Sequence, residues 1–289
     1  MKLALLNDFE SYAGAETSIK QRLKAKPDDL EVDFITPDME IDYGKYDGFI
    51  LENIVKFKPD VLKILVDKPF IKVEHDFNFC LYRNQIHCKQ CDEPCPVLYN
   101  PLIKEIYTKA LLVICASPAH MELQKQLLAD WDIKYTYGLP WTYASTQIPK
   151  VKRNPKSVAF LGTIKKYKGV YDIINLAQRK QDYIFDIAGR HGGLKGKLPD
   201  NVNYLGEVEN KWDYLASHEY FIHIPRHLDP CPGTIIEAIL AGCKIIFNPN
   251  VGTLSYPFHT KKQWEEALKH SGAVFWKRAT ETFNKHKND

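Results

Sequence analysis

The sequence predicts an α/β protein made of two doubly wound, Rossmann-like parallel-sheet units, which we expect to face each other across a cleft. Short apolar runs alternate with segments of helical character, and this order is typical of a parallel sheet covered by helices on both faces. The alternation stops and restarts near residue 150, so the pattern occurs twice. A length of 289 residues is sufficient for two units of ordinary size.

Residues 1–150 are expected to form the first unit. Its strands are brief apolar runs, and a polar turn at residues 7–9 follows the first of them. The expected strands are residues 3–6, 32–35, 46–51, 70–73 and 111–115, and the expected helices are residues 13–24, 61–66, 102–109 and 119–128.

Residues 151–260 are expected to form the second unit, after a break at Asn154-Pro155-Lys156. Residues 261–289 should add two helices that pack back toward the first unit. In the second unit we expect strands at 158–161, 183–188, 202–205, 220–224 and 243–247, and helices at 169–178, 212–216 and 234–241, while the C-terminal helices are expected at 262–269 and 274–285.

Composition and charge exclude some classes of protein. No apolar run approaches the roughly 18 to 20 residues that a membrane span needs, and the apolar N-terminus is too short for a signal peptide, so we expect a cytoplasmic protein. Residues 1–150 carry 18 Lys and Arg against 22 Asp and Glu, a net charge of −4 within a total of +3. The basic second half suits a polyphosphate ligand or nucleic acid, although ordinary surface variation also explains it.

The segment from Leu228 to Asn248 is the most informative. Two prolines and a glycine forbid regular structure just before the helix at 234–241, whose free N–H groups and dipole favour a phosphate. Asp229 precedes this helix and Glu237 lies one turn inside it, eight positions later. Two carboxylates beside an anion-binding helix end indicate a ligand with both hydroxyls and phosphates. An ordinary loop–helix–strand unit with solvated acids is the alternative.

Two other strand ends carry glycine. Gly162 is followed by a loop with three lysines, whose charges suit phosphate, or simply form a solvated basic loop. A second expected strand ends at Gly189. In this order, these segments resemble the nucleotide-binding half of the retaining glycosyltransferases of family 4, which have the GT-B fold. The resemblance covers roughly residues 156–256, with weaker support in the first half.

The resemblance implies a role for each matching residue. Glu237 matches the acid that holds the nucleotide ribose, and Asp229 matches a glutamate that contacts the transferred sugar, with one methylene less. Lys168 matches the lysine on the diphosphate. Thr163 stands where the family has an arginine, for which Lys165, Lys166 or Arg190 could compensate. The remaining matches are Gly162 and Gly189 at the strand ends, Gly206 and Val208 beside the base, and Gly233 and Thr234 at the diphosphate-binding helix start.

In the first half, Gly14 resembles the glycine of the turn that opens the family's first helix, where it allows close approach of the donor or acceptor. His75 and Asp76 follow a predicted strand and resemble the family's His-Asp pair, with the histidine near the sugar and the reacting centre. A solvated surface pair is the alternative interpretation of these two residues.

Four cysteines fall within sixteen residues, and four thiolates at this density suit a tetrahedral structural zinc site. Disulfides or free thiols are alternatives, and His87 could replace one thiol. The predicted ligands are Cys80, Cys88, Cys91 and Cys95.

The resemblance therefore implies transfer of a sugar from a UDP- or GDP-sugar with retention of configuration, without a catalytic divalent metal. The acceptor would be a glycan or a lipid-linked precursor, with a DNA base as a further possibility. A non-catalytic nucleotide-sugar or glycan-binding protein and a sugar-nucleotide epimerase are the competing functions. Thr163 and Asp229 are the departures that keep the non-catalytic alternative open.

Overall fold

A computed structural model describes residues 1–8, 14–80, 100–140, 148–190, 194 and 196–288. The chain divides into two compact units. Unit 1 comprises Met1–Trp141 together with Ala267–Asp289, and unit 2 comprises Thr142–Glu266. Among the described residues, no helix is both long enough and apolar enough to cross a membrane.

Unit 1 contains a six-stranded sheet in the order β2-β1-β3-β4-β5-β6, and every neighbouring pair is parallel. The order reverses between β1 and β3, which creates the switch point typical of doubly wound sheets. The strands are β1 (Lys2–Leu6), β2 (Glu31–Ile35), β3 (Gly48–Leu51), β4 (Phe70–Glu74), β5 (Leu112–Cys115) and β6 (Tyr135–Tyr137), and the helices are α1 (Gly14–Lys24), α2 (Pro59–Leu65), α4 (Pro101–Thr108), α5 (Pro118–Leu127) and the part of α9 (Lys261–Asn288) that begins at Ala267.

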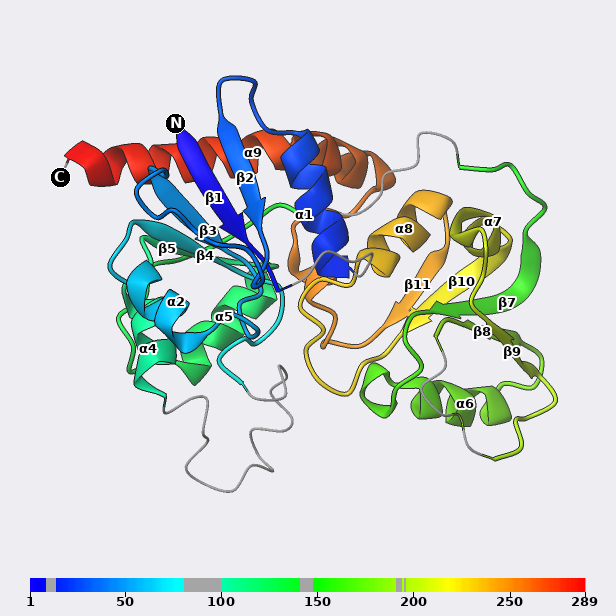
Figure 1. Cartoon of the computed structure of the whole chain (residues 1–289). Coiled ribbons are helices and arrows are strands. Elements are labelled where there is room, and N and C mark those ends of the chain that lie inside the picture. Colours follow the sequence, from blue (N-terminus) through cyan, green and yellow to red (C-terminus); the bar gives the residue numbers. More distant parts are fainter. Residues whose placement is uncertain (9–13, 81–99, 141–147, 191–193, 195, 289) are drawn as a thin grey trace. The chain divides into compact units, whose positions relative to one another are not determined.

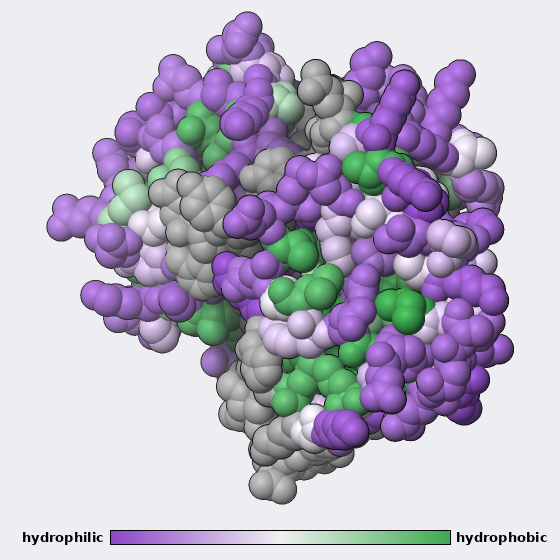
Figure 2. All heavy atoms as spheres, turned by 90° about the vertical axis from the view of Figure 1, so that its right-hand side faces the viewer, coloured by the Kyte–Doolittle hydropathy of each residue, from purple (hydrophilic) through white to green (hydrophobic). Residues whose placement is uncertain are grey.

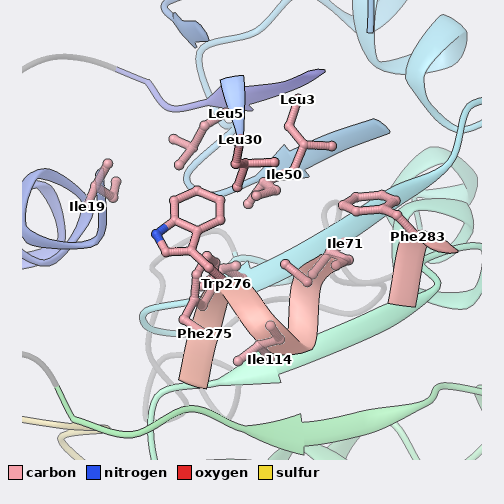
Figure 3. Packing of buried hydrophobic residues seen from close by; sticks show 12 residues of the cluster. Leu3, Leu5, Ile19, Leu30, Ile50, Ile71, Ile114, Phe275, Trp276 and Phe283 are labelled. Carbon is pink, nitrogen blue, oxygen red and sulfur yellow. The ribbon is translucent and has the colours of Figure 1, made fainter. Parts of the chain in front are cut away.

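The core of unit 1 lies between the sheet and the helices α1 and α9 (Figure 3). Trp276 of α9 is fully buried, and its indole Nε1 donates a 2.7 Å hydrogen bond to the backbone oxygen of Arg22 in α1. Burying a tryptophan requires a partner for this N–H group, and the end of α1 supplies it. The other side chains of this core include Leu3, Leu5, Ile19, Leu30, Ile50, Ile71, Ile114, Phe275 and Phe283.

The C-terminal segment forms one helix of 28 residues instead of the two expected helices. The gap expected between the two helices contains Ser271 and Gly272, and both are buried within α9. The Ser271 hydroxyl donates to the backbone oxygen of Leu268, so its polar group is satisfied inside the helix. Burial of Phe275, Trp276 and Phe283 outweighs the cost of about 1 kcal/mol that glycine imposes on a helix interior.

Unit 2 contains a five-stranded parallel sheet in the order β11-β10-β7-β8-β9. Figure 1 shows α6 on one face and α7 with α8 on the other. The two faces have separate cores, because Val158 and Phe160 pack toward α6 while Ala159 between them packs toward α7 and α8. The elements are β7 (Asn154–Leu161), α6 (Val170–Arg179), β8 (Ile184–Ala188), β9 (Val202–Gly206), α7 (Lys211–Ala216), β10 (His218–His223), α8 (Gly233–Ala241) and β11 (Lys244–Phe247).

The expected break at Asn154-Pro155-Lys156 lies inside strand β7. The pairing of β7 with β10 shifts register there, and Lys156 has a positive φ of 56°. A bulge of this kind lets an irregular segment join a sheet, because the extra residues are left out of the ladder. β6 was not expected from the sequence, since three half-buried residues at a sheet edge have no apolar run to mark them.

The surface is largely hydrophilic, and hydrophobic residues form separate small areas on the face shown in Figure 2. Isolated exposed apolar side chains are normal for a folded protein, so they indicate no binding surface by themselves. In unit 2 the large exposed side chains of this kind include Val151, Ile184, Leu205 and Phe247.

Candidate functional site

The candidate site of unit 2 lies at the carboxyl ends of β7 and β10, where the strand order reverses. Ligands of open α/β sheets bind at this position because the loops that follow the two strands diverge there. The loop after β7 carries Lys168, and the loop after β10 carries Asp229 and leads into α8. Two of the residues predicted to contact the ligand therefore come from the two strands that form the switch point.

Asp229 is the centre of this site. Its carboxylate oxygen Oδ2 accepts a hydrogen bond of 2.6 Å from Lys168 Nζ and lies 2.8 Å from His223 Nε2. The Asp229 backbone is anchored as well, because its N–H donates to Asn250 and its oxygen accepts from Gly252. The side chain is only 12% exposed, so its partners and its backbone together determine where the carboxylate points.

Charge governs the protonation of Asp229. Burial by itself would raise the pKa of this carboxyl, but the Lys168 ammonium and the hydrogen bond from His223 lower it further than burial raises it. The net result is a pKa well below the ordinary value for aspartate. Asp229 is therefore an anion at any physiological pH, and it can act as a hydrogen-bond acceptor for hydroxyl groups.

Gly169 places Lys168 beside Asp229. Lys168 ends the short 3-10 helix Lys166–Lys168, and Gly169 follows with a left-handed φ of 81°. A side chain at Gly169 would collide with the backbone oxygen of Ile224, which follows β10. Only glycine allows the two loops to approach this closely, and this approach brings Lys168 from the β7 loop to the β10 loop.

Glu237 forms a second acid–lysine pair. It lies inside α8 with a side chain only 7% exposed, and its Oε1 accepts a 2.6 Å hydrogen bond from Lys211 Nζ at the start of α7. α8 itself begins with Gly233 and Thr234, and its N-cap residue Pro232 makes no side-chain capping bond. The first amides of α8 are thus suited to an anion, as the sequence suggested.

The predicted glycines meet at the carboxyl edge of the sheet. Gly189 has a φ of 134° and lies so close to Gly162 that a side chain there would collide with the Gly162 backbone oxygen. Its N–H also donates a 2.7 Å hydrogen bond to the Gly206 oxygen. The ends of β7, β8 and β9 are thereby tied together without side chains, and the half-buried Val208 follows two residues after Gly206.

Thr163 and the three basic residues that could compensate for the missing arginine are all exposed. Thr163 and Lys165 are exposed, and the Lys165 ammonium lies 5.6 Å from the centre of the Tyr167 ring. Arg190 is exposed and its Nε is 3.5 Å from Glu207. Lys166, the remaining candidate, is exposed as well. The contacts of Lys165 with Tyr167 and of Arg190 with Glu207 involve neither Asp229 nor Glu237.

In unit 1, His75 follows β4 and its ring nitrogen Nε2 lies 2.6 Å from Glu52 Oε2. Glu52 is fully buried after β3, and its other oxygen lies 2.7 Å from Arg22 of α1. Burial opposes ionisation of Glu52, yet Arg22 and His75 lower its pKa from 4.5 to about 2. The carboxylate therefore holds His75 in one orientation, while the imidazole remains 16% exposed.

A second buried pair supports the same sheet edge. Lys72 and Glu74 of β4 are both fully buried, 2.6 Å apart. The Lys72 ammonium also donates 2.7 Å hydrogen bonds to the backbone oxygens of Glu52 and Val73, and Gln124 of α5 donates to Glu74. Asp76, the other half of the predicted His-Asp pair, accepts from Asn78 through Oδ1.

Only one of the four predicted zinc ligands lies among the described residues. Cys80 is buried, but Cys88, Cys91 and Cys95 lie outside the described residues. Within the described ranges, no group of three or more His, Cys, Asp or Glu side chains is arranged for a metal ion.

Gly14, the glycine that was expected to open the first helix, is the first residue of α1.

Four residues that contact or support the predicted site residues were not expected from the sequence. His223 ends an apolar strand and Lys211 opens a short helix, so neither belongs to a motif. Glu52 and Arg22 are separated by thirty residues, and both belong to residue types that are usually solvated. The one available signal was the position of His223 and Glu52 directly at strand ends, where ligand-binding residues gather.

Comparison with known proteins gives a consistent result for the fold. No family model matches the sequence. A segment of 49 residues is 43% identical to the capsular polysaccharide biosynthesis glycosyltransferase CapH of Staphylococcus aureus. This match spans 17% of the chain and only 14% of the length of CapH.

Solved structures match nearly the whole chain. The Anabaena protein HepE, solved in complex with UDP and glucose, has a TM-score of 0.63 at 15% identity, with 99% of this chain and 100% of that chain covered. WaaG, a glycosyltransferase involved in lipopolysaccharide biosynthesis, has a TM-score of 0.56 at 10% identity, with 99% and 95% covered. At these identities the likeness shows the fold alone: two parallel-sheet α/β units of the GT-B type, as the sequence predicted.

Proposed function

We propose that the protein is a glycosyltransferase that moves a sugar from a nucleotide-diphosphate sugar, UDP- or GDP-linked, to an acceptor hydroxyl with retention of configuration. The acceptor is proposed to be a glycan or a lipid-linked precursor. The observation that carries this proposal is the pair of buried acids, Asp229 and Glu237, each held by a lysine beside the start of α8. UDP in the structure of HepE, which shares the fold, supports a nucleotide donor.

The chemistry of the site matches the parts of such a donor. Amides at the start of α8 and the Lys168 ammonium suit the diphosphate, where charge develops as the leaving group departs. The Glu237 carboxylate suits ribose hydroxyls, because a carboxylate accepts hydrogen bonds from hydroxyl groups. Asp229 suits hydroxyls of the transferred sugar, and His75 is proposed to act near that sugar.

Transfer breaks the bond between the anomeric carbon and the diphosphate oxygen, and forms a bond from the same carbon to the acceptor oxygen. Retention follows if the acceptor attacks from the face that the diphosphate leaves, with the acceptor proton passing to the departing phosphate. In this mechanism the protein supplies position and charge, and no protein nucleophile is required. The diphosphate-binding groups then stabilise the transition state more than the bound donor.

A screen of nucleotides tests the donor class. We expect UDP or GDP to raise the melting temperature of the protein, since a ligand at one hundred times its Kd stabilises by about 2.7 kcal/mol. AMP and inorganic phosphate serve as controls and should have little effect. Transfer to a glycan acceptor, followed by anomeric analysis of the product, then tests retention. An epimerase would instead alter the donor sugar without any acceptor, and a melting temperature that no nucleotide shifts would contradict the proposal.

We also propose that Cys80, Cys88, Cys91 and Cys95 bind one structural zinc ion. The proposal rests on their spacing in the sequence, which suits four thiolate ligands. Metal analysis of the purified protein should find about one zinc per chain. Replacing Cys88 and Cys91 with serine should abolish the metal content, whereas replacing the buried Cys243 of the other unit should leave it unchanged. Metal-free protein in which these thiols titrate as free cysteines would contradict it.

A further inference from the structure

His223 occupies a position in the site that the donor chemistry above does not use. It is the last residue of β10, six positions before Asp229, and its side chain is only 4% exposed. Nε2 lies 2.8 Å from Asp229 Oδ2. The ring is stacked on Phe160 of β7, with ring centres 6.3 Å apart and planes inclined by 20°. His223 is thus held by the two strands that form the switch point.

The second ring nitrogen indicates which tautomer is present. Nδ1 of His223 is buried and has no hydrogen-bond partner among the described residues. A proton on Nδ1 would bury an N–H group without an acceptor, which costs more than leaving a lone pair there. The proton therefore belongs on Nε2, and His223 donates a hydrogen bond to Asp229.

Of the two partners of Asp229, Lys168 is held less firmly than His223. Its side chain is 26% exposed and flexible, whereas the His223 ring is packed between strands. If Lys168 contacts the donor diphosphate, as proposed above, its ammonium must turn at least partly away from Asp229. His223 then becomes the partner that keeps Oδ2 in place, because its ring has no room to follow.

We propose that His223 is a positioning residue that fixes the Asp229 carboxylate through Oδ2 and thereby presents Oδ1 to a hydroxyl of the transferred sugar. The contacts of Asp229 with Lys168 and His223 both use Oδ2, so Oδ1 is the oxygen that faces a ligand. The carboxylate is rigid and the Asp229 backbone is anchored, so a fixed Oδ2 restricts the direction of Oδ1. This inference rests on the proposed function and assigns His223 to selection of the sugar.

Two variants separate the hydrogen bond from packing. His223→Gln keeps an N–H donor close to the position of Nε2, while His223→Leu keeps the bulk and removes the donor. Binding of UDP, GDP, UDP-glucose and GDP-mannose to each purified protein is measured by calorimetry. The relevant quantity is the gain in affinity of the sugar nucleotide over the matching nucleoside diphosphate, which isolates the sugar.

We expect His223→Leu to reduce that gain about ten- to hundredfold, as a lost hydrogen bond to a charged group predicts. Affinity for UDP or GDP alone should be unchanged, and His223→Gln should retain most of the gain. If His223→Leu does not fold, His223→Asn replaces it, because its amide reaches the position of Nδ1 and not that of Nε2.

The possible failures are distinguishable. If the wild type binds neither UDP nor GDP, the proposed function is wrong and the role of His223 with it. If it binds a nucleotide, and His223→Leu keeps the full sugar-dependent gain, only the inference is wrong. A wild type that binds no sugar nucleotide better than its nucleoside diphosphate also overturns the inference, since His223 would then have no sugar to orient.

Discussion

Replacing Glu237 with alanine should weaken the binding of the nucleotide and slow sugar transfer by at least about a hundredfold. The variant removes a carboxylate that accepts two ribose hydroxyls in the proposed complex, and each such charged hydrogen bond is worth about 1.5–3 kcal/mol. The protein should still fold, because the Lys211 side chain that loses its contact with Glu237 is 30% exposed and can be solvated. Calorimetric titration with UDP and GDP, and transfer rates measured with the donor that binds, give the two quantities.

Glu219→Ala is the matched control for this experiment. Glu219 is also an acid of unit 2 that pairs with a lysine, 2.9 Å from Lys244, but it lies near the start of β10 and not at its carboxyl end. Its loss should leave nucleotide affinity and transfer rate unaffected. A folded Glu237→Ala protein that transfers sugar at the wild-type rate would contradict the role in ribose binding.

The largest loss of stability is expected from Glu52→Gln. Glutamine keeps the shape of the side chain but removes the negative charge that lies 2.7 Å from the Arg22 cation, whose side chain is only 2% exposed. Removing one partner of a buried ion pair costs about 3–5 kcal/mol, because the remaining charge stays buried. Equilibrium urea unfolding at pH 7 should show this loss in the transition that reports on unit 1.

The same variant predicts a dependence on pH. The pKa of Glu52 in the folded protein is about 2, below its ordinary value of 4.5, so the ionised carboxylate stabilises the fold above pH 4.5. This contribution is lost as the pH falls from about 4.5 to 2, since both states then bind the proton. The difference in the free energy of unfolding between wild type and Glu52→Gln should therefore be constant from pH 7 to 5 and shrink below pH 4.5.

Glu31→Gln is the control for the stability measurement. Glu31 forms an ion pair with Lys2 at a similar distance, 2.9 Å, but its side chain is 71% exposed. Water replaces the lost contact there, so the unfolding transition should scarcely move. If Glu52→Gln changed the free energy of unfolding as little as Glu31→Gln, the ion pair between Arg22 and Glu52 would not stabilise the fold.

Much of the fold could be predicted because parallel strands with helices on both sides leave a strong pattern. The continuous apolar runs of β1 and β5 are visible in the sequence because both faces of these strands are largely buried. The failures occurred where the pattern is weak. The three half-buried residues of β6 have no apolar run, and the gap expected near residue 272 is helical because Phe275 and Trp276 are buried by a continuous helix.

For the candidate site as well, some features could be predicted from the sequence and others could not. Asp229, Glu237, Lys168 and the strand-end glycines could be proposed from the sequence because they match the ordered motifs of the family that it resembles. That Lys168 pairs with Asp229, 61 residues later, and Lys211 with Glu237, 26 residues later, could not be predicted, because no motif records these contacts. A role for Lys165, Lys166 or Arg190 at the diphosphate remains a prediction.

By itself, the sequence determined that the chain folds as two parallel-sheet α/β units and that two acids flank a phosphate-friendly helix start. Periodicity and loop chemistry are local properties, so a single chain displays them. Only the tertiary structure decided which cation faces which acid, that His223 shares Asp229 with Lys168, and that Arg22 and Glu52 are buried behind His75. Such pairings depend on the register of the strands and on the close approach of loops at positions such as Gly169, which no local pattern records.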